Sequence, residues 1–179
     1  VFKNHNKSLF DFYGFSFGSV KNDKWRNEVK NYFTYFEDIT GISDQKAANL
    51  IRKHEIDILI DLSGLTGNSR VGILSYQASS IQINYLGYPG TIGAKFINYI
   101  IADEIVIPKE NLKYYTEKVI YLPHCYQANM RKRKISEKKF ERKDFGLPQE
   151  GVVFCSFNNN YKITPYIFDS WMKILNGVK

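Results

Sequence analysis

Two polar loops hold the residues of this sequence that are best suited to chemistry. The first is the segment LGYPGT at residues 86–91, which follows a run rich in apolar and β-branched residues. Its glycines, Gly87 and Gly90, allow a ligand to approach the backbone closely, and Pro89 stiffens the turn. The spacing matches neither a Walker loop nor a GxGxxG loop, so a purely structural turn is the alternative interpretation.

The second loop is FNNNYKITP at residues 157–165. Its pattern predicts a helix with Thr164 as the N-cap and Pro165 at the first helical position. The amino end of a helix attracts anions, and Lys162 adds a positive charge just before it, so the loop suits a diphosphate. The amide of Asn159 could pair with the edge of a base or a sugar. Alternatively, the asparagines form a plain turn and Lys162 is solvated.

Asp57 and Asp61 are candidates for acid–base chemistry, because residues four apart on a strand point to the same face. Asp61 also suits a second role, in which its side chain caps the loop after the strand. The sequence has no Asp-x-Asp motif and no Ser-His-Asp or Cys-His arrangement. If the chain handles a nucleotide-sugar, we therefore expect a metal-free reaction in which positive side chains and a helix dipole stabilise the leaving diphosphate.

The cysteines and histidines form no recognisable site. Cys125 and Cys155 stand beside apolar or aromatic residues and make no CxxC motif, so we predict buried free thiols in a reducing compartment. The three histidines are far apart in the sequence and lack metal-ligand spacing.

The net charge of +7 is concentrated in a basic stretch at residues 127–143. Such a run can bind nucleic acid or an anionic lipid surface, but Phe140 is its only aromatic residue, and we interpret it as a solvated linker. No apolar run is long enough to cross a bilayer. A hydrophobic share of 44% with 16% aromatic residues favours a folded globular protein over a disordered one.

Strand-like and helix-like segments alternate along most of the chain. Strands are expected at residues 9–17, 56–62, 81–86, 99–102, 118–122 and 152–157, and helices at 24–36, from Ser43 through Ile51, at 70–77 and from Thr164 onward. This alternation predicts an α/β fold with a mostly parallel sheet, whose strands share one rim where ligands bind. The basic stretch interrupts this alternation of strands and helices, so a second α/β unit is expected to begin after it.

These segments, in this order, resemble the catalytic region of O-GlcNAc transferases and SPINDLY proteins, which form glycosyltransferase family 41. The resemblance runs from about residue 9 to residue 178 and is most specific in LGYPGT and FNNNYKITP. It implies a GT-B fold, of which this chain would hold most of one Rossmann-like lobe and the first β-α unit of the other. The expected parts are a partial amino-terminal lobe at residues 1–126, a basic linker at 127–147 and the incomplete nucleotide-binding lobe at 148–179.

The resemblance also implies an activity for the parent protein, namely inverting, metal-independent transfer of N-acetylglucosamine from UDP-GlcNAc to Ser or Thr of proteins. The expected partners are the UDP-sugar donor and a protein acceptor held by tetratricopeptide repeats, with no cofactor, no membrane and no nucleic acid. The expected location is the cytoplasm, and the isolated chain is expected to be inactive. A different donor (GDP-fucose, or UDP-glucose with transfer to Asn) and a non-catalytic binding fragment are the alternatives.

Site residues follow from the resemblance position by position. Donor binding is assigned to Leu86, Gly87, Pro89, Asn159, Tyr161 and Lys162, with Arg70 and Thr91 as additional candidates. Lys162 matches the family's catalytic lysine, which contacts the diphosphate, and Asn159 stands where animal enzymes have a nucleotide-contacting Gln.

Three departures from the family are visible. Leu65 stands where the family has Tyr or His in Gly-Tyr-Thr or Gly-His-Thr, so a polar side chain is lost near the rim. The family's Asp-x-x-x-His segment and its later His-Thr-Thr and Asp fall outside this sequence. The long insert of the animal enzymes is replaced by the basic linker, which is typical of bacterial or plant members.

Overall fold

The computed structural model of the chain describes residues 1–18, 24–130 and 134–178. The chain divides into two compact units, with unit 1 at Val1–Asn129 and unit 2 at Met130–Lys179. This division falls inside the predicted linker. Three basic residues of that linker, Arg131, Lys132 and Arg133, lie outside the described residues.

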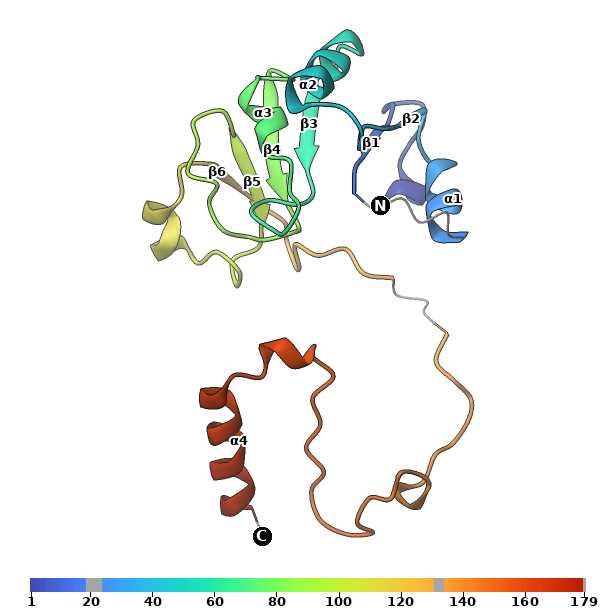
Figure 1. Cartoon of the computed structure of the whole chain (residues 1–179), viewed down its shortest axis with the longest axis vertical. Coiled ribbons are helices and arrows are strands. Elements are labelled where there is room, and N and C mark those ends of the chain that lie inside the picture. The colour runs from blue at the N-terminus through green and yellow to red at the C-terminus, as the bar shows by residue number, and fades with distance from the viewer. Residues whose placement is uncertain (19–23, 131–133, 179) are drawn as a thin grey trace. The chain divides into compact units, whose positions relative to one another are not determined.

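The strands of unit 1 are short and all run parallel to their neighbours (Figure 1). A two-stranded sheet pairs β1 (Tyr13–Ser16) with β2 (Tyr35–Asp38). A four-stranded sheet has the order β3 (Ile58–Asp61), β4 (Ile81–Tyr85), β5 (Tyr99–Ala102) and β6 (Lys118–Tyr121). This arrangement confirms the predicted α/β class with parallel strands, because parallel neighbours require a crossover between them.

The helices of unit 1 lie in the crossovers and turns. They are η1 (Phe2–Asn4), α1 (Lys24–Lys30), α2 (Asp44–Lys53), α3 (Gly72–Ser75) and η2 (Lys109–Tyr114), where η marks a 3-10 helix. α2 begins at its predicted cap, where the Ser43 hydroxyl accepts a hydrogen bond from the Lys46 N–H (3.3 Å). This contact satisfies one of the free N–H groups at the start of the helix.

The larger hydrophobic core cluster in the described part of unit 1 lies between one face of the strands and the two helices α2 and α3. The buried residues of this core are Ile39, Ala47, Ala48, Ile51, Ile73, Leu74, Ala78 and Ile97. Phe15 of β1 and Leu59 of β3 both pack against it, so the two sheets share one hydrophobic layer. Ala47 and Ala48 are fully buried, and their small side chains allow α2 to approach the strands closely.

The opposite face of β3 is left uncovered. Ile58 and Ile60 are 50% and 44% exposed, although they alternate with the partly buried Leu59 and Asp61. β3 is also the edge strand of its four-stranded sheet. An apolar face beside an unpaired strand edge favours association with other chains.

Two predicted elements differ from the structure of unit 1. The helix expected at residues 24–36 ends at Lys30, and residues from Tyr35 onward form β2 instead. The aromatic residues Phe33 and Phe36 produced the helical pattern, but their rings pack against Gly14 of β1, where a Cβ would lie 2.7 Å from the Phe36 ring. Pairing with β1 therefore overrides local helix propensity. The helix expected at 70–77 is present only as the short α3.

Unit 2 contains η3 (Arg142–Phe145), η4 (Asn160–Lys162) and α4 (Pro165–Gly177). The predicted start of α4 is confirmed, because the Thr164 hydroxyl accepts from the Ile167 N–H (3.4 Å) and Pro165 occupies the first turn. The strand expected at residues 152–157 is not formed, and this segment is exposed. A strand needs a partner, and the described residues of unit 2 include no other strand. In the described part of the chain, no helix has the length and apolar character needed to cross a membrane.

Replacing both Ile58 and Ile60 by Lys is expected to reduce self-association of the chain, because two charges on the uncovered face oppose contact through it. Sedimentation velocity measures the association, and circular dichroism checks that the fold is kept. Ile105→Lys serves as the control, since Ile105 is 85% exposed on a different part of unit 1. Association that is equally strong in the double variant would show that this face is not responsible.

Candidate functional site

The side chain of Asp61 closes the loop that follows β3. Its carboxylate oxygens accept hydrogen bonds from the backbone N–H groups of Ser63 (3.0 Å) and Gly64 (2.9 Å). Gly64 has a left-handed backbone with φ of +58°, a conformation that glycine adopts without strain. Of the two roles open to Asp61 from the sequence, the structure shows the loop cap, while Asp57 lies exposed just before the strand.

The loop after β4 passes so close to this first loop that Gly87 has no room for a side chain. A Cβ on Gly87 would lie 2.2 Å from the carbonyl oxygen of Ser63. Beneath the same loop, the buried Asn84 donates a hydrogen bond from Nδ2 to the carbonyl of Gly90 (3.2 Å). The two loops therefore form one rim at the carboxyl ends of adjacent parallel strands, which is where ligands bind in sheets of this kind.

Leu86, the first residue of the loop, has a strained backbone. Its φ of +80° lies in the left-handed region that residues with a side chain rarely adopt. Such a conformation costs about 1–3 kcal/mol and persists only where surrounding contacts enforce it, often at ligand sites. Gly90 is also constrained, because a Cβ there would lie 2.3 Å from the ring of Tyr88. The loop is thus a tightly packed structural element.

Two residues near the start of β6 hold the far end of the loop. The hydroxyl of Tyr115 donates to the carbonyl of Pro89 (3.0 Å), and the carboxylate of Glu117 accepts from the hydroxyl of Thr91 (2.6 Å). Burial, followed by the neighbouring Tyr88 and Glu117, raises the pKa of Tyr115, so the phenol keeps the proton that it donates. Sequence reasoning missed both residues, because YYTEKV matches no motif.

Asp103 anchors the segment that leaves the sheet. This buried carboxylate accepts hydrogen bonds from the N–H groups of Tyr126 (2.8 Å), Val106 (2.8 Å) and Ile105 (3.0 Å). These bonds, led by the one from Tyr126, hold the pKa of Asp103 below its ordinary value despite the opposing effect of burial. The carbonyl of Tyr126 in turn accepts from the hydroxyl of Tyr85 (2.6 Å). The backbone before the predicted linker is therefore tied to the ends of β4 and β5.

Arg70 is bonded to the segment that leads into α2. Its guanidinium donates to the carboxylate of Asp44 (2.7 and 2.8 Å) and to the carbonyl oxygens of Ile39 (2.6 Å) and Ile42 (2.7 Å). These bonds join the connection before α2 to the segment before α3, and the side chain is 15% exposed. The geometry gives Arg70 a structural role, and its predicted contact with the donor stays a prediction.

The second predicted loop lies in unit 2 and forms a single turn before α4. The N–H of Lys162 donates to the carbonyl of Asn159 (3.0 Å), and Tyr161 between them is 75% exposed. Lys162 is exposed as well. The structure thus brings Asn159, Tyr161 and Lys162 together in unit 2, and it brings Leu86, Gly87, Pro89 and Thr91 together in unit 1.

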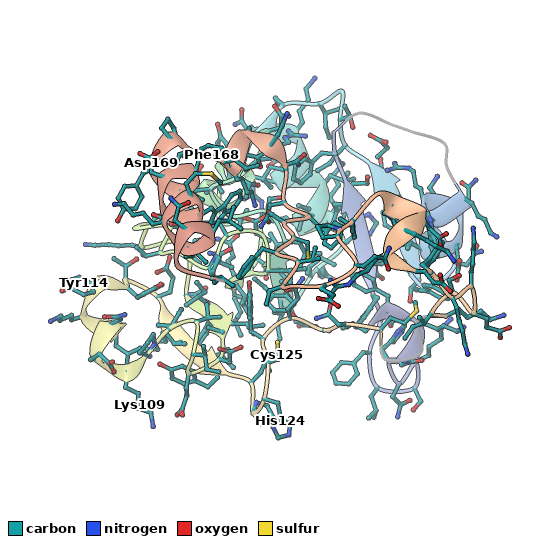
Figure 2. All side chains as sticks on the ribbon, turned by 90° about the horizontal axis from the view of Figure 1, so that it is seen from below. Lys109, Tyr114, His124, Cys125, Phe168 and Asp169 are labelled. Atoms are coloured by element: carbon teal, nitrogen blue, oxygen red, sulfur yellow. The ribbon has the colours of Figure 1, made fainter. Side chains whose placement is uncertain are left out.

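The segment after β6 exposes two adjacent reactive side chains, His124 and Cys125, with the His124 ring turned away from the ribbon (Figure 2). The prediction of buried cysteines is wrong, because Cys125 and Cys155 are both exposed free thiols. Cys125 follows a strand end, and Cys155 lies in the segment where the expected strand did not form. Within the described ranges, no three His, Cys, Asp or Glu side chains are grouped so that they could hold a metal ion.

Unit 1 has the parallel sheet of an α/β protein, with two packed loops at the carboxyl ends of β3 and β4, and unit 2 holds a lysine just before the start of α4. The chain belongs to glycosyltransferase family 41, whose model, described as glycosyl transferase family 41, matches residues 1–138 and 131–179. This match confirms the family indicated by the two loop motifs.

Named relatives agree with this assignment. The chain is 36% identical over 183 residues to a probable UDP-N-acetylglucosamine–peptide N-acetylglucosaminyltransferase SEC of Arabidopsis thaliana, covering 99% of this chain and 19% of the relative. It is 33% identical over 162 residues to a SPINDLY protein of Eustoma exaltatum subsp. russellianum with the same activity in its name, covering 89% and 17%. The chain therefore spans about a fifth of the length of the curated relatives it matches.

A solved structure shows the same fold. A mutant of the O-GlcNAc transferase of Thermobaculum terrenum superposes with a TM-score of 0.82 at 22% sequence identity, covering 98% of this chain and 32% of that one. The prediction that the chain has part of the fold of this catalytic region is thereby confirmed.

Gly87→Ala is expected to destabilise unit 1 by roughly 1–3 kcal/mol, because the added methyl group overlaps the Ser63 carbonyl and forces the two loops apart. Thermal unfolding followed by circular dichroism measures the change. Gly67→Ala is the matched control, since a Cβ at Gly67 meets no atom within 4 Å and should be nearly neutral. Equal stability of the two variants would contradict the close packing of the rim.

Asp103→Asn is expected to lower the unfolding temperature at neutral pH, because the amide cannot accept from all three N–H groups. The folded pKa of Asp103 is depressed, so its stabilising effect is present above the ordinary aspartate pKa and is lost as pH falls through the folded pKa. The difference between wild type and variant should therefore shrink in acid. A pH series of unfolding curves tests this, with the exposed Asp57→Asn as control, and a difference independent of pH would exclude the ionised carboxylate as its source.

Proposed function

We propose that the protein to which this chain belongs transfers N-acetylglucosamine from UDP-GlcNAc to Ser or Thr hydroxyls of proteins. The observation that carries the proposal is family membership over both units, together with relatives named for transfer of N-acetylglucosamine to peptides. Those names also favour UDP-GlcNAc over GDP-fucose or UDP-glucose as the donor. The acceptor is a protein, and the proposed location is the cytoplasm.

The proposed division of work follows the two loops. Residues 86–91 contact the sugar, because they form the closely packed rim beside β3 and β4. Asn159 and Tyr161 contact the nucleotide from the turn before α4. Residues 1–126 belong to the amino-terminal lobe, 127–147 link the lobes, and 148–179 begin the nucleotide-binding lobe.

Lys162 is the proposed catalytic residue. It is exposed on the turn before the free N–H groups of α4, so its ammonium and the helix start add positive potential in the same place. Negative charge develops on the leaving UDP as the bond to the sugar breaks, with inversion at the sugar carbon. In the proposed mechanism this charge is stabilised by Lys162 and backbone N–H groups without a metal ion.

Lys162→Ala in the full-length protein is expected to lower kcat/KM for transfer by about 10²–10³-fold, the range for removal of one group that stabilises developing charge. Transfer of radiolabelled N-acetylglucosamine to an acceptor protein provides the measurement. Lys173→Ala is the control, because Lys173 lies in α4 well after its first turn.

Unchanged transfer by Lys162→Ala would exclude the assigned role. The same assay with labelled GDP-fucose and UDP-glucose tests the identity of the donor. If transfer from either of them is faster than from UDP-GlcNAc, that nucleotide-sugar is the donor.

A further inference from the structure

A buried carboxylate lies behind the loop at residues 86–91. Glu117 is 5% exposed and immediately precedes β6, far from the loop in sequence. Its Oε1 accepts from the backbone N–H of Ile92 (2.7 Å). Its Oε2 accepts from the hydroxyl groups of Thr91 (2.6 Å) and Thr116 (3.2 Å). One side chain thus binds both the main chain and the side chain at the end of the loop.

No ion pair balances this charge among the described residues. A buried carboxylate without a cation is costly unless its oxygens accept hydrogen bonds. In the described part of the chain, the donors to Glu117 are Thr91 at the end of the loop, Ile92 directly after it and its own neighbour Thr116. The loop and the carboxylate therefore stabilise each other, and a shift of the loop would leave Glu117 with too few donors.

Thr91 transmits this restraint along the loop. While its hydroxyl donates to Glu117, the same oxygen accepts from the N–H of Gly93 (3.0 Å) and, more weakly, from that of Thr116 (3.4 Å). On the other side of the loop, the contact of Gly87 with the Ser63 carbonyl prevents movement toward β3. The loop is thus held at both ends, by packing at Gly87 and by hydrogen bonds at Thr91.

We infer that Glu117 is a positioning residue for the donor sugar, which it serves by fixing the 86–91 loop from behind. The inference rests on the proposed function, in which that loop contacts the sugar. Glu117 is too buried to touch the donor and acts only through Thr91 and Ile92. It follows that loss of Glu117 weakens recognition of the sugar and leaves recognition of the nucleotide, assigned to unit 2, unchanged.

The test compares binding of UDP-GlcNAc and of UDP to the full-length protein by isothermal calorimetry. Glu117→Ala is expected to weaken UDP-GlcNAc binding about tenfold, because the loop that contacts the sugar must then be ordered on binding, and to leave UDP binding within about twofold. Glu117→Gln should recover only part of the affinity, because its amide oxygen can still accept from the Ile92 N–H while its NH₂ cannot accept from the hydroxyls of Thr91 and Thr116. Glu110→Ala, at an exposed position of η2 nearby, is the matched control.

Thr91→Val probes the same contact from the loop side. If Glu117 acts through Thr91, the losses of UDP-GlcNAc affinity caused by Thr91→Val and Glu117→Ala should be less than additive in the double variant. Should Glu117→Ala fail to fold, as judged by circular dichroism, Glu117→Gln and Thr91→Val still give the ratio of UDP-GlcNAc to UDP affinity.

The possible outcomes separate the inference from the proposed function. Equal weakening of UDP and UDP-GlcNAc would show a general loss of structure and overturn the positioning role, as would unchanged affinity for both. If wild-type protein binds another nucleotide-sugar in place of UDP-GlcNAc, the proposed donor is wrong. The same comparison with that donor and its nucleotide then decides the role of Glu117.

Discussion

The contact between Gly87 and the carbonyl of Ser63 constrains the rest of the rim. Any Cβ at Gly87 would overlap that carbonyl, so the loop after β4 can take its path only because the residue is glycine. With this path set, Leu86 is held in a left-handed conformation and the far end of the loop reaches Thr91 and its partner Glu117. A rigid rim of this kind can orient a ligand without reorganising on binding.

Three polar side chains under the rim each form hydrogen bonds with the backbone of a loop. Asp61 caps the loop after β3, Asn84 supports the loop after β4, and Asp103 fixes the segment that leaves the sheet after β6. Each lies at or just beyond the carboxyl end of a strand, and each binds backbone groups of a loop. Buried polar groups need hydrogen-bond partners. The bonds from these side chains therefore hold each loop in one conformation.

In unit 2, the sequence correctly predicted a helix start but not a strand. The Thr164 cap and Pro165 specify the start of α4, because capping depends on neighbouring residues only. A strand at residues 152–157 would need a second strand to pair with. The described residues of unit 2 form no strand, and residues 152–157 are not in one. The uncovered face of β3 in unit 1 is a related case, since covering it requires a further layer.

By itself the sequence determined the α/β class, most strand positions and the starts of α2 and α4. It also identified the loop at residues 86–91 by its glycines and the loop at residues 157–165 by Lys162. These features arise from residue spacing and local propensity, and the motifs were specific enough to indicate the family. Only the tertiary structure decided that Phe36 lies in a strand, that Arg70 binds Asp44 and that Glu117 holds Thr91. These contacts join residues about 20 or more positions apart, and such pairing is set by packing of the whole unit, which no local pattern encodes.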